Sequence, residues 1–362
     1  MSQERSYRDF DWWLLVIALI LCAIGVLQIY SATLDTKWRD AWWKQLVWIG
    51  ISLFAMWLVM QIDYHTLLGQ VPVMYSVCVG LLLLTFAVGT YVFGSRRWIG
   101  YGWAKFQTSE FFKIVLVLLV ARYLSEMPQQ RLELRDLFKL GGLVGLPMVL
   151  VMMQPDLGTS LTYTPILLIG IFLAGLRWQH VLSIAGLAIL LLPAGWFLLR
   201  DYQKGRIMTF IDPSRDAKGS GYQVIQSKIA VGSGGVWGQG ATKGLQTQLR
   251  FLPVPHTDFI FSAFAEEHGF VGVTVVLGLY FLMLLQIVQN AQTAPDREGL
   301  YICMGVAALL LFHLFVNVGM VVGRMPVTGI PLPFMSSGGS NLLAVFILLG
   351  LVNNVRLRRF GN

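Results

Sequence analysis

The chain has 362 residues, of which 56% are hydrophobic and 13% are charged, and its formal net charge is +8. Soluble domains are about 45–50% apolar and about 25% charged, so this composition excludes a soluble enzyme and predicts a polytopic membrane protein. The excess of positive charge suits anionic lipid headgroups better than nucleic acid. The three cysteines all lie in apolar runs, which argues against disulfide bonds or a zinc site built from them.

Ten apolar segments are candidates for membrane-spanning helices, which need about 20 mostly apolar residues. Six are clear, namely Trp12–Tyr30, Gln45–Ile62, Val71–Phe93, Val181–Leu199, Phe270–Val288 and Leu300–Val322. Four are shorter or interrupted, namely Ser109–Leu124, Leu140–Met153, Leu161–Leu176 and Leu342–Val355. We therefore predict an all-α integral membrane protein with about ten transmembrane helices, forming a single polytopic domain over residues 1–362.

The positive charges choose the side of the membrane on which the termini lie. An even number of crossings puts both termini on the same side. If that side is the cytoplasm, the inner segments hold eleven Lys and Arg residues and the outer segments hold sixteen, eight of them in residues 200–257. Long loops are exempt from the positive-inside rule, and the remaining balance of eleven to eight favours cytoplasmic termini.

Residues 95–113, SRRWIGYGWAKFQTSEFFK, place four cations between aromatic residues on the predicted outer side. Such aromatic residues are typical of the interfacial belt of a membrane protein. Glu110 and Lys113 are three positions apart, a spacing that suits an ion pair within one helix. A lysine at the centre of an apolar helix costs roughly 2.5–3.5 kcal/mol on insertion scales, so Lys113 needs a partner or an aqueous cavity.

Two other stretches predict turns near the membrane surface. QPDLGTS, residues 154–160, ends one helix and begins another, and Asp156 is placed to cap the second helix. RMPVTGIPLPFMSSGGSN, residues 324–341, contains three prolines and cannot form a helix, so we expect an ordered, re-entrant outer loop. His313, inside an apolar run, is interpreted as a hydrogen-bonded core histidine.

Residues 200–257 form the only large polar insertion, and we expect it to be extracytoplasmic. Its segment YQVIQSKIAVGSGG carries apolar residues at helical spacing and then glycines, which predicts a short amphipathic helix and an ordered loop. The following glycine-dense stretch lacks the spacing of a Walker phosphate loop, so tight turns are the preferred interpretation.

The loop leads into FLPVPHTDFIFSAFAEEHG, residues 251–269, where Asp258 stands among aromatic residues at the edge of an apolar run. Local sequence leaves two interpretations open. Thr257 or Asp258 could cap a helix that begins near Phe259. Alternatively, residues 258–268 form a half-helix at the outer interface and leave the Asp258 carboxylate facing a cavity, because ionisable groups at such depth are partnered or functional.

Several of these stretches together resemble the signatures of the SEDS proteins (shape, elongation, division, sporulation), in the expected order and over nearly the whole chain. They are RRWIGYGWAKFQTSEFFK, QPDLGTS, YQVIQSKIAVGSGG, GLQTQLRFLPVPHTDFIFSAFAEEHGFVG and GIPLPFMSSGGS. GLQTQLRFLP and the AEE after it resemble the elongation branch more than the division branch, in which GEELG is usual. Thr108, Ser337 and His268 replace the family's usual proline, tyrosine and leucine, and none of the three is an acidic position.

The resemblance implies the SEDS fold, with residues 200–257 as its large extracytoplasmic loop. It implies a peptidoglycan glycosyltransferase that joins lipid II units into glycan strands on the outer face of the bacterial inner membrane, for elongation and rod shape. Asp258 is the implied catalytic carboxylate. The predicted substrate-binding residues are Arg97, Glu110, Lys113, Asp156 and His256. A divalent cation, Mg²⁺ or Mn²⁺, at the pyrophosphate is compatible with this chemistry, but no metal ligands can be read from the spacing.

The expected partners are lipid II, a class B penicillin-binding protein that acts as transpeptidase, and other membrane proteins of the elongation complex, with no nucleic acid. Two alternatives to the enzyme are a lipid II flippase and a non-catalytic scaffold of a transpeptidase. A flippase needs a polar path through the membrane, whereas the ionisable residues here gather on the predicted outer side. We therefore prefer the enzyme.

Overall fold

The computed structural model describes residues 9–359 apart from 35, 93–94, 102–103, 128–131, 217–218 and most of 176–200. Seven of the described helices are long and apolar enough to cross a bilayer. They are α1 (Trp12–Thr33), α2 (Ala41–Gln61), α4 (Val71–Val88), α6 (Leu134–Met153), α13 (Ile260–Gln292), α14 (Arg297–Val321) and α15 (Gly339–Leu357). The predicted multi-pass helical membrane protein is confirmed.

The remaining predicted spans differ more from the structure. The segment Ser109–Leu124 is a helix, α5 (Thr108–Ser125), and it is buried along most of its length. The helix predicted over Leu161–Leu176 is present as the shorter α8 (Thr164–Leu173), and a short helix that was not predicted, α7 (Leu157–Leu161), precedes it. Asp156 caps α7 five residues before the predicted run begins at Leu161, so helical structure starts earlier than predicted. The segment Val181–Leu199 falls largely outside the described residues.

The predicted helix Val71–Phe93 is too long at its C-terminal end. The helix α4 ends at Val88, and the chain then forms a small antiparallel sheet. Its strands are β1 (Thr90–Val92), β2 (Ser95–Tyr101) and β3 (Ala104–Phe106), in the order β1-β2-β3. Aromatic and β-branched residues with glycines favour strands and tight turns over helix here. The sheet carries the predicted cation-rich segment.

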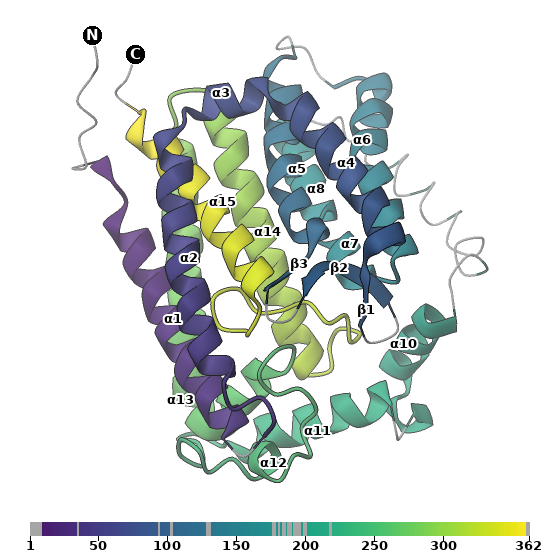
Figure 1. The fold of residues 1–362 in the computed structure, drawn as a ribbon, viewed down its shortest axis with the longest axis vertical. Helices are drawn as coiled ribbons and strands as arrows, with labels where there is room; N and C mark the ends of the chain where they lie inside the picture. Colours follow the sequence, from purple (N-terminus) through teal and green to yellow (C-terminus); the bar gives the residue numbers. More distant parts are fainter. Residues whose placement is uncertain are drawn as a thin grey trace.

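The helices α14 and α15 form the centre of the bundle. The helix α2 packs along α15, and α13 and α5 pack along α14. Arg356, near the end of α15, donates to the Asp9 carbonyl at 2.9 Å and pairs with Asp11 at 3.0 Å. The two ends of the described chain therefore meet at one end of the bundle, as expected for an even number of crossings. The short helix α3 (Tyr64–Gly69) lies at this end (Figure 1).

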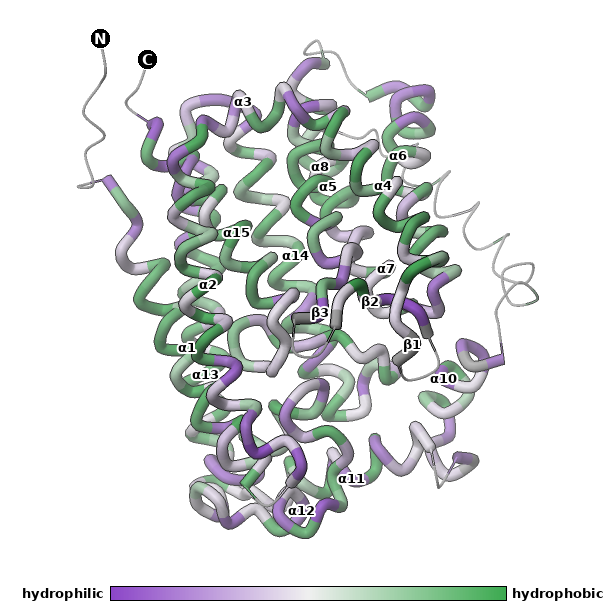
Figure 2. Tube along the Cα trace, in the orientation of Figure 1, coloured by the Kyte–Doolittle hydropathy of each residue, from purple (hydrophilic) through white to green (hydrophobic). Residues whose placement is uncertain are grey.

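The polar insertion lies at the opposite end of the bundle and is built of short helices (Figure 1). These are α10 (Asp201–Ile211), a 3₁₀ turn η2 (Pro213–Asp216), α11 (Ser220–Ser233) and α12 (Leu245–Gln248). The helix α11 is the predicted amphipathic helix, and it stops at a glycine, Gly234. Figure 2 shows hydrophobic residues along the long helices and more hydrophilic ones at the two ends of the molecule.

The helix α13 consists of two parts. Gly269, with φ 62° and ψ −164°, interrupts the helical backbone, and its positive φ is open to glycine at little cost. The first part begins at Ile260 and the apolar spanning part follows Gly269. The predicted half-helix ahead of Phe270 is therefore present, with its start at Ile260 rather than at Asp258.

Candidate active site

Asp258 lies in the turn immediately before α13. The N-cap of this helix is Phe259, and no side chain makes a capping hydrogen bond there. The capping interpretation of Thr257 and Asp258 is therefore wrong. The Asp258 carbonyl accepts a hydrogen bond from Asn317 Nδ2 at 3.0 Å, which fixes the turn to α14. The Asp258 side chain is left without a helix-capping role.

The Asp258 carboxylate faces the proline-rich segment 324–338. A Cβ placed on Gly329 would lie 3.4 Å from Asp258 Oδ2. Burial raises the pKa of the Asp258 carboxyl, whereas the Arg206 guanidinium and the Thr257 hydroxyl oppose this increase and Asp156 adds to it. The carboxyl is therefore a stronger base than an exposed aspartate, and it lies within the electrostatic reach of one cation and one further carboxylate.

Arg206 comes from α10, in the polar insertion, and sequence reasoning missed it. Its Nη1 donates to the Thr328 carbonyl at 3.1 Å, one residue from Gly329. Nothing in the sequence around Arg206 distinguishes it from the other cations of the loop. The fold alone places this guanidinium beside Asp258.

Arg97 and Asp156 lie together at the edge of the same segment. Arg97, on β2, pairs with Asp156 Oδ1 at 3.6 Å and donates to the carbonyls of Gln154, at 3.0 Å, and Pro155. Asp156 is buried, caps α7 as predicted by accepting from the Thr159 amide, and accepts from Gln107 Nε2 at 3.0 Å. Arg97 therefore links the sheet to the turn that contains Asp156.

The turn at Asp156 packs directly against segment 324–338. A Cβ on Gly158 would lie 2.5 Å from the Thr328 carbonyl oxygen, so only glycine allows this approach. Thr328 therefore contacts both the turn after Asp156 and Arg206. Through it, the structure brings Asp258, Asp156, Arg97 and Arg206 into one region.

Glu110 and Lys113 form a buried ion pair on α5, with Lys113 Nζ 2.7 Å from Glu110 Oε2. Glu110 Oε2 also accepts from Asn341 Nδ2 at 2.8 Å, which links the pair to α15. Lys113 Nζ lies 3.4 Å from His313 Nε2, and His313 Nδ1 lies 3.2 Å from the Pro331 carbonyl. His313 is thus the hydrogen-bonded core histidine that was predicted.

This chain of contacts runs from Lys113 to the proline-rich segment that faces Asp258. Both charges of the pair are almost fully buried, with 2% of the Lys113 side chain and 5% of the Glu110 side chain exposed. Their geometry supports a positioning role beneath the site. Direct contact of either residue with the substrate stays a prediction.

His256 is buried two residues before Asp258. Its ring lies 5.6 Å from that of Trp38, and its carbonyl accepts from the Ser337 amide at 2.9 Å. Burial lowers the pKa of the His256 imidazole to about 4, so the ring is neutral near pH 7. Ser336 Oγ donates to the Thr257 carbonyl at 2.7 Å, so segment 324–338 holds both residues of this turn. The role of His256 in binding substrate stays a prediction.

Segment 324–338 is therefore the floor of the site. It is free of helix, as its prolines predicted, but the helix-free stretch predicted over residues 324–341 is three residues too long, because α15 begins at Gly339. Its backbone carbonyls accept hydrogen bonds from Gln45 of α2, Arg206 of α10 and Asn317 of α14. Its Ser336 hydroxyl and Ser337 amide donate to the Asp258 turn. These contacts come from segments far apart in the chain, so they fix the position of the carboxylate in three dimensions.

Comparisons with known proteins identify the family of this chain. Residues 11–359 match the family model of FtsW/RodA/SpoVE, described as cell cycle protein. The chain belongs to the FtsW/RodA/SpoVE family. The peptidoglycan glycosyltransferase MrdB of Escherichia coli (strain K12) is 38% identical, over 98% of this chain and 96% of the relative.

Solved structures of the FtsW/RodA/SpoVE family share the fold. The rod shape determining protein RodA of Thermus thermophilus is 29% identical, with a TM-score of 0.74, over 98% of this chain and 99% of that one. A chain in a study of the structural coordination of polymerization and crosslinking by a peptidoglycan synthase complex is 34% identical, with a TM-score of 0.84 and the same coverage. The predicted SEDS membership, with its likeness to RodA, is confirmed.

The site of this FtsW/RodA/SpoVE protein contains carboxylates that could bind the expected divalent cation. Magnesium is usually held by one or two carboxylates together with substrate phosphates and water. Asp258 and Asp156 are carboxylates in the same region, so the residues present fit such an ion. Neither Mg²⁺ nor Mn²⁺ is needed to explain the protein contacts described here, and the cation stays a prediction.

Proposed function

We propose that this chain polymerises lipid II into glycan strands at the outer face of the bacterial inner membrane, as the glycosyltransferase of cell-wall elongation. The observation that carries the proposal is the Asp258 carboxylate, which caps no helix and is held in a turn at the edge of α13 beside Arg206. The names of the relatives support the reaction class, since MrdB is a peptidoglycan glycosyltransferase.

Asp258 suits the role of general base. The acceptor sugar hydroxyl must lose its proton as its oxygen attacks the anomeric carbon of the donor, and a carboxylate within hydrogen-bond reach contributes typically 10²–10⁴-fold. Burial raises the pKa of Asp258, which brings the carboxyl closer to the working pH and makes it a better base. As the new bond between oxygen and the anomeric carbon forms, the bond from that carbon to the pyrophosphate oxygen breaks. One carboxylate fits direct displacement with inversion.

Arg97 and Arg206 suit the leaving pyrophosphate. Negative charge develops on this group as it departs, and fixed guanidinium groups stabilise it. Arg97 already donates to backbone carbonyls of the turn before Asp156, and Arg206 donates to the Thr328 carbonyl in the floor, so both are oriented before substrate arrives. Arg97→Gln is expected to raise the lipid II concentration needed for half-maximal rate, whereas its exposed neighbour Arg96→Gln is the matched control. Equal kinetics for the two variants would remove Arg97 from the binding site.

The activity itself is tested with purified components. The protein in detergent is incubated with lipid II alone, and glycan strands are resolved by gel electrophoresis. Strand formation without any other protein is expected. A purified protein that moves lipid II between the leaflets of vesicles but forms no strands would favour the flippase, and one that does neither would favour the scaffold.

The reaction requires the polar insertion to lie outside the cytoplasm, with both termini inside. Ala241 in the insertion and Thr66 on α3 are both exposed and lie toward opposite ends of the bundle. We expect Ala241→Cys to react with a membrane-impermeant maleimide in intact spheroplasts, and Thr66→Cys to react only after lysis. The reverse pattern would invert the topology and place Asp258 on the cytoplasmic side.

The proposed partner is a class B penicillin-binding protein, which would crosslink the strands as they form. The similar chain from a peptidoglycan synthase complex that coordinates polymerization and crosslinking supports this pairing. Other membrane proteins of the elongation machinery are expected around the two. Co-purification of the transpeptidase from membranes in mild detergent tests the pairing, and its consistent absence would contradict it.

A further inference from the structure

A second group of titratable side chains lies where α3 meets the beginning of α14. His65 is in the first turn of α3, Asp296 is the N-cap of α14, and Glu298 is in the first turn of α14. Asn317, which holds the Asp258 turn, lies 20 residues after the first residue of the same helix, or about 30 Å along its axis. The group is therefore remote from the candidate active site.

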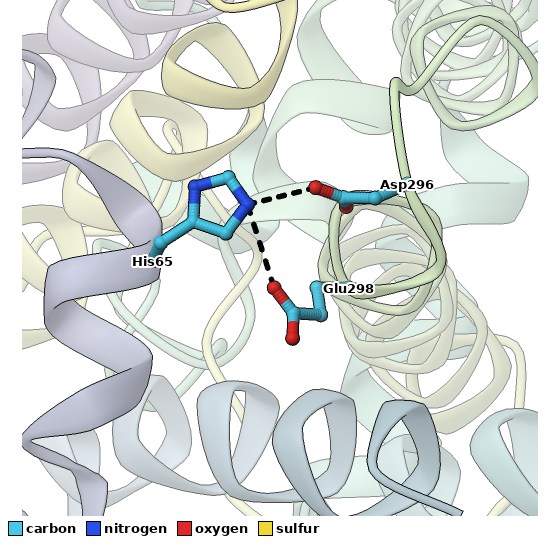
Figure 3. A group of neighbouring side chains, drawn as sticks. All are labelled: His65, Asp296 and Glu298. Carbon is cyan, nitrogen blue, oxygen red and sulfur yellow. Dashed lines mark hydrogen bonds and ion pairs between the residues drawn. The ribbon is translucent and has the colours of Figure 1, made fainter. Parts of the chain in front are cut away.

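The three side chains converge on one point (Figure 3). His65 Nε2 lies 2.8 Å from Asp296 Oδ2 and 3.5 Å from Glu298 Oε2. A tetrahedral zinc ion with ligands at about 2.0–2.2 Å places its ligand atoms about 3.4 Å apart. The two histidine–carboxylate separations bracket this value, and all three ligand atoms lie within 4.8 Å of one another, so side-chain movements of about 1 Å would complete such a site.

The second nitrogen of His65 determines what Nε2 can do. His65 Nδ1 lies 2.9 Å from Asp63 Oδ1, and because an ionised carboxylate can only accept, Nδ1 carries the proton. In the neutral imidazole, Nε2 then carries a lone pair, and this lone pair points at two carboxylate oxygens. Three acceptors that face one another require a cation between them, either a metal ion or a proton on Nε2.

The contacts around the three residues match those that support metal ligands. A ligating histidine usually donates its other N–H to a carboxylate, and ligating carboxylates are themselves hydrogen-bonded. Here Asp63 accepts from His65, the Tyr64 hydroxyl donates to Asp296 Oδ2 at 2.5 Å, and the Ser125 hydroxyl donates to Glu298 Oε1 at 3.2 Å. Each proposed ligand is thereby oriented from outside the trio.

The surrounding charges and exposure also suit a divalent ion. Among the groups facing the trio, Asp63 adds a third carboxylate, and Arg358 Nε, at 3.2 Å from Asp63 Oδ2, offsets one of these charges. Half of the His65 side chain is exposed, so water can supply a fourth ligand. Three protein ligands with one open position form a common zinc arrangement.

We propose that His65, Asp296 and Glu298 bind a divalent transition-metal ion of the zinc class. The ion ties the first turn of α3, which directly follows α2, to the beginning of α14. Since α2 packs along the central helix α15, and α14 carries Asn317 at its other end, the ion would hold together the helices that carry the active site. The site stands apart from the proposed glycosyl transfer and does not depend on it.

The test measures zinc binding rather than polymerisation. Full-length protein in detergent, with any affinity tag removed, is stripped of metal and titrated with Zn²⁺ against a chromogenic chelator. Wild type is expected to bind one equivalent that His65→Gln and Glu298→Gln both lose. His268→Gln is the matched control, because it removes an imidazole outside the trio, and it should bind as wild type does. Asp63→Asn should weaken binding by about 10–100-fold.

Thermal melting completes the test. Zn²⁺ is expected to raise the melting temperature of wild type and of His268→Gln, and to leave that of Glu298→Gln unchanged, since only a ligand bound to the folded state stabilises it. If wild type binds no more zinc than Glu298→Gln, the cation at Nε2 is a proton and the proposal fails. Asp63→Asn, which leaves all three proposed ligands in place, keeps the test decisive if a ligand variant does not fold.

Discussion

Asp258→Asn is expected to lower glycan-strand formation from lipid II by at least about 100-fold, because an amide cannot accept the proton of the attacking hydroxyl. The substitution keeps the size and shape of the side chain. It also leaves the main-chain contact of this turn intact, since Asn317 donates to the Asp258 carbonyl and not to its carboxylate. Purified wild type and variant are compared in the lipid II polymerisation assay.

The folded state of this variant should be at least as stable as that of wild type. Burial raises the pKa of Asp258 in the folded protein, so the folded state holds this proton more tightly than the unfolded state does. The stabilising effect of protonation is full at low pH and is lost as pH rises through the raised pKa, so at neutral pH the ionised carboxylate costs stability. A neutral amide removes that cost. Melting in detergent should therefore show an equal or higher temperature for Asp258→Asn.

Asp156→Asn is the matched control, because Asp156 is a neighbouring buried carboxylate and Asn is an equally good helix cap. We expect it to retain much more activity than Asp258→Asn. A folded Asp258→Asn protein that still makes strands at close to the wild-type rate would rule out the base. A loss of activity confined to Asp156→Asn would move that role to Asp156.

The rate should also depend on pH in a defined direction. A general base works only when deprotonated, so the rate should fall as pH decreases through the pKa of Asp258, which burial raises from its ordinary value. His256 cannot cause this fall near neutral pH, because burial keeps its pKa at about 4.

The sequence predicted those parts of the fold that depend on local composition. Apolar runs located the long helices, and the prolines of residues 324–341 predicted a segment without helix, which the structure shows up to Gly338. The polar residues before Phe270 predicted the half-helix, and the structure places the break at Gly269. Each of these features follows from the hydrophobicity or backbone freedom of neighbouring residues.

The errors share a different cause. The strands after Val88 and the early start of α7 at Leu157 depend on pairing and capping, which override the hydrophobic length on which the predictions relied. Asp258 was recognised from its motif, but its freedom from capping became visible only in the structure. Arg206 carries no local signal at all, because its approach to Thr328 joins residues 122 positions apart.

Glu110 and Lys113 show both what local sequence can predict and what it cannot. The three-residue spacing predicted their ion pair, and the cost of a lysine inside an apolar helix predicted that Lys113 must have a partner. The further partners, Asn341 and His313, lie more than 190 residues away along the chain and could not be read from spacing. They turn a local pair into a connection between α5, α14 and α15.

Removing one member of this buried ion pair is expected to lower the free energy of unfolding substantially. Lys113→Met leaves Glu110 charged and buried without its cation, and such losses typically cost about 3–5 kcal/mol. The double variant Glu110→Gln/Lys113→Met has no buried charge at this position, and replacing both members of such a pair is often neutral or stabilising. Melting in detergent should therefore be depressed in Lys113→Met and largely restored in the double variant.

Polymerisation should not return with the stability of the double variant. Lys113 contacts His313, and His313 contacts the Pro331 carbonyl in the segment that faces Asp258, so methionine removes the polar partner that orients His313 toward that segment. We expect the double variant to melt near the wild-type temperature while its rate stays at least about tenfold lower, a loss equivalent to about 1.4 kcal/mol of transition-state stabilisation. A double variant that recovers both stability and rate would show that the pair serves packing alone, and the search for residues that act on the pyrophosphate would then narrow to Arg97 and Arg206.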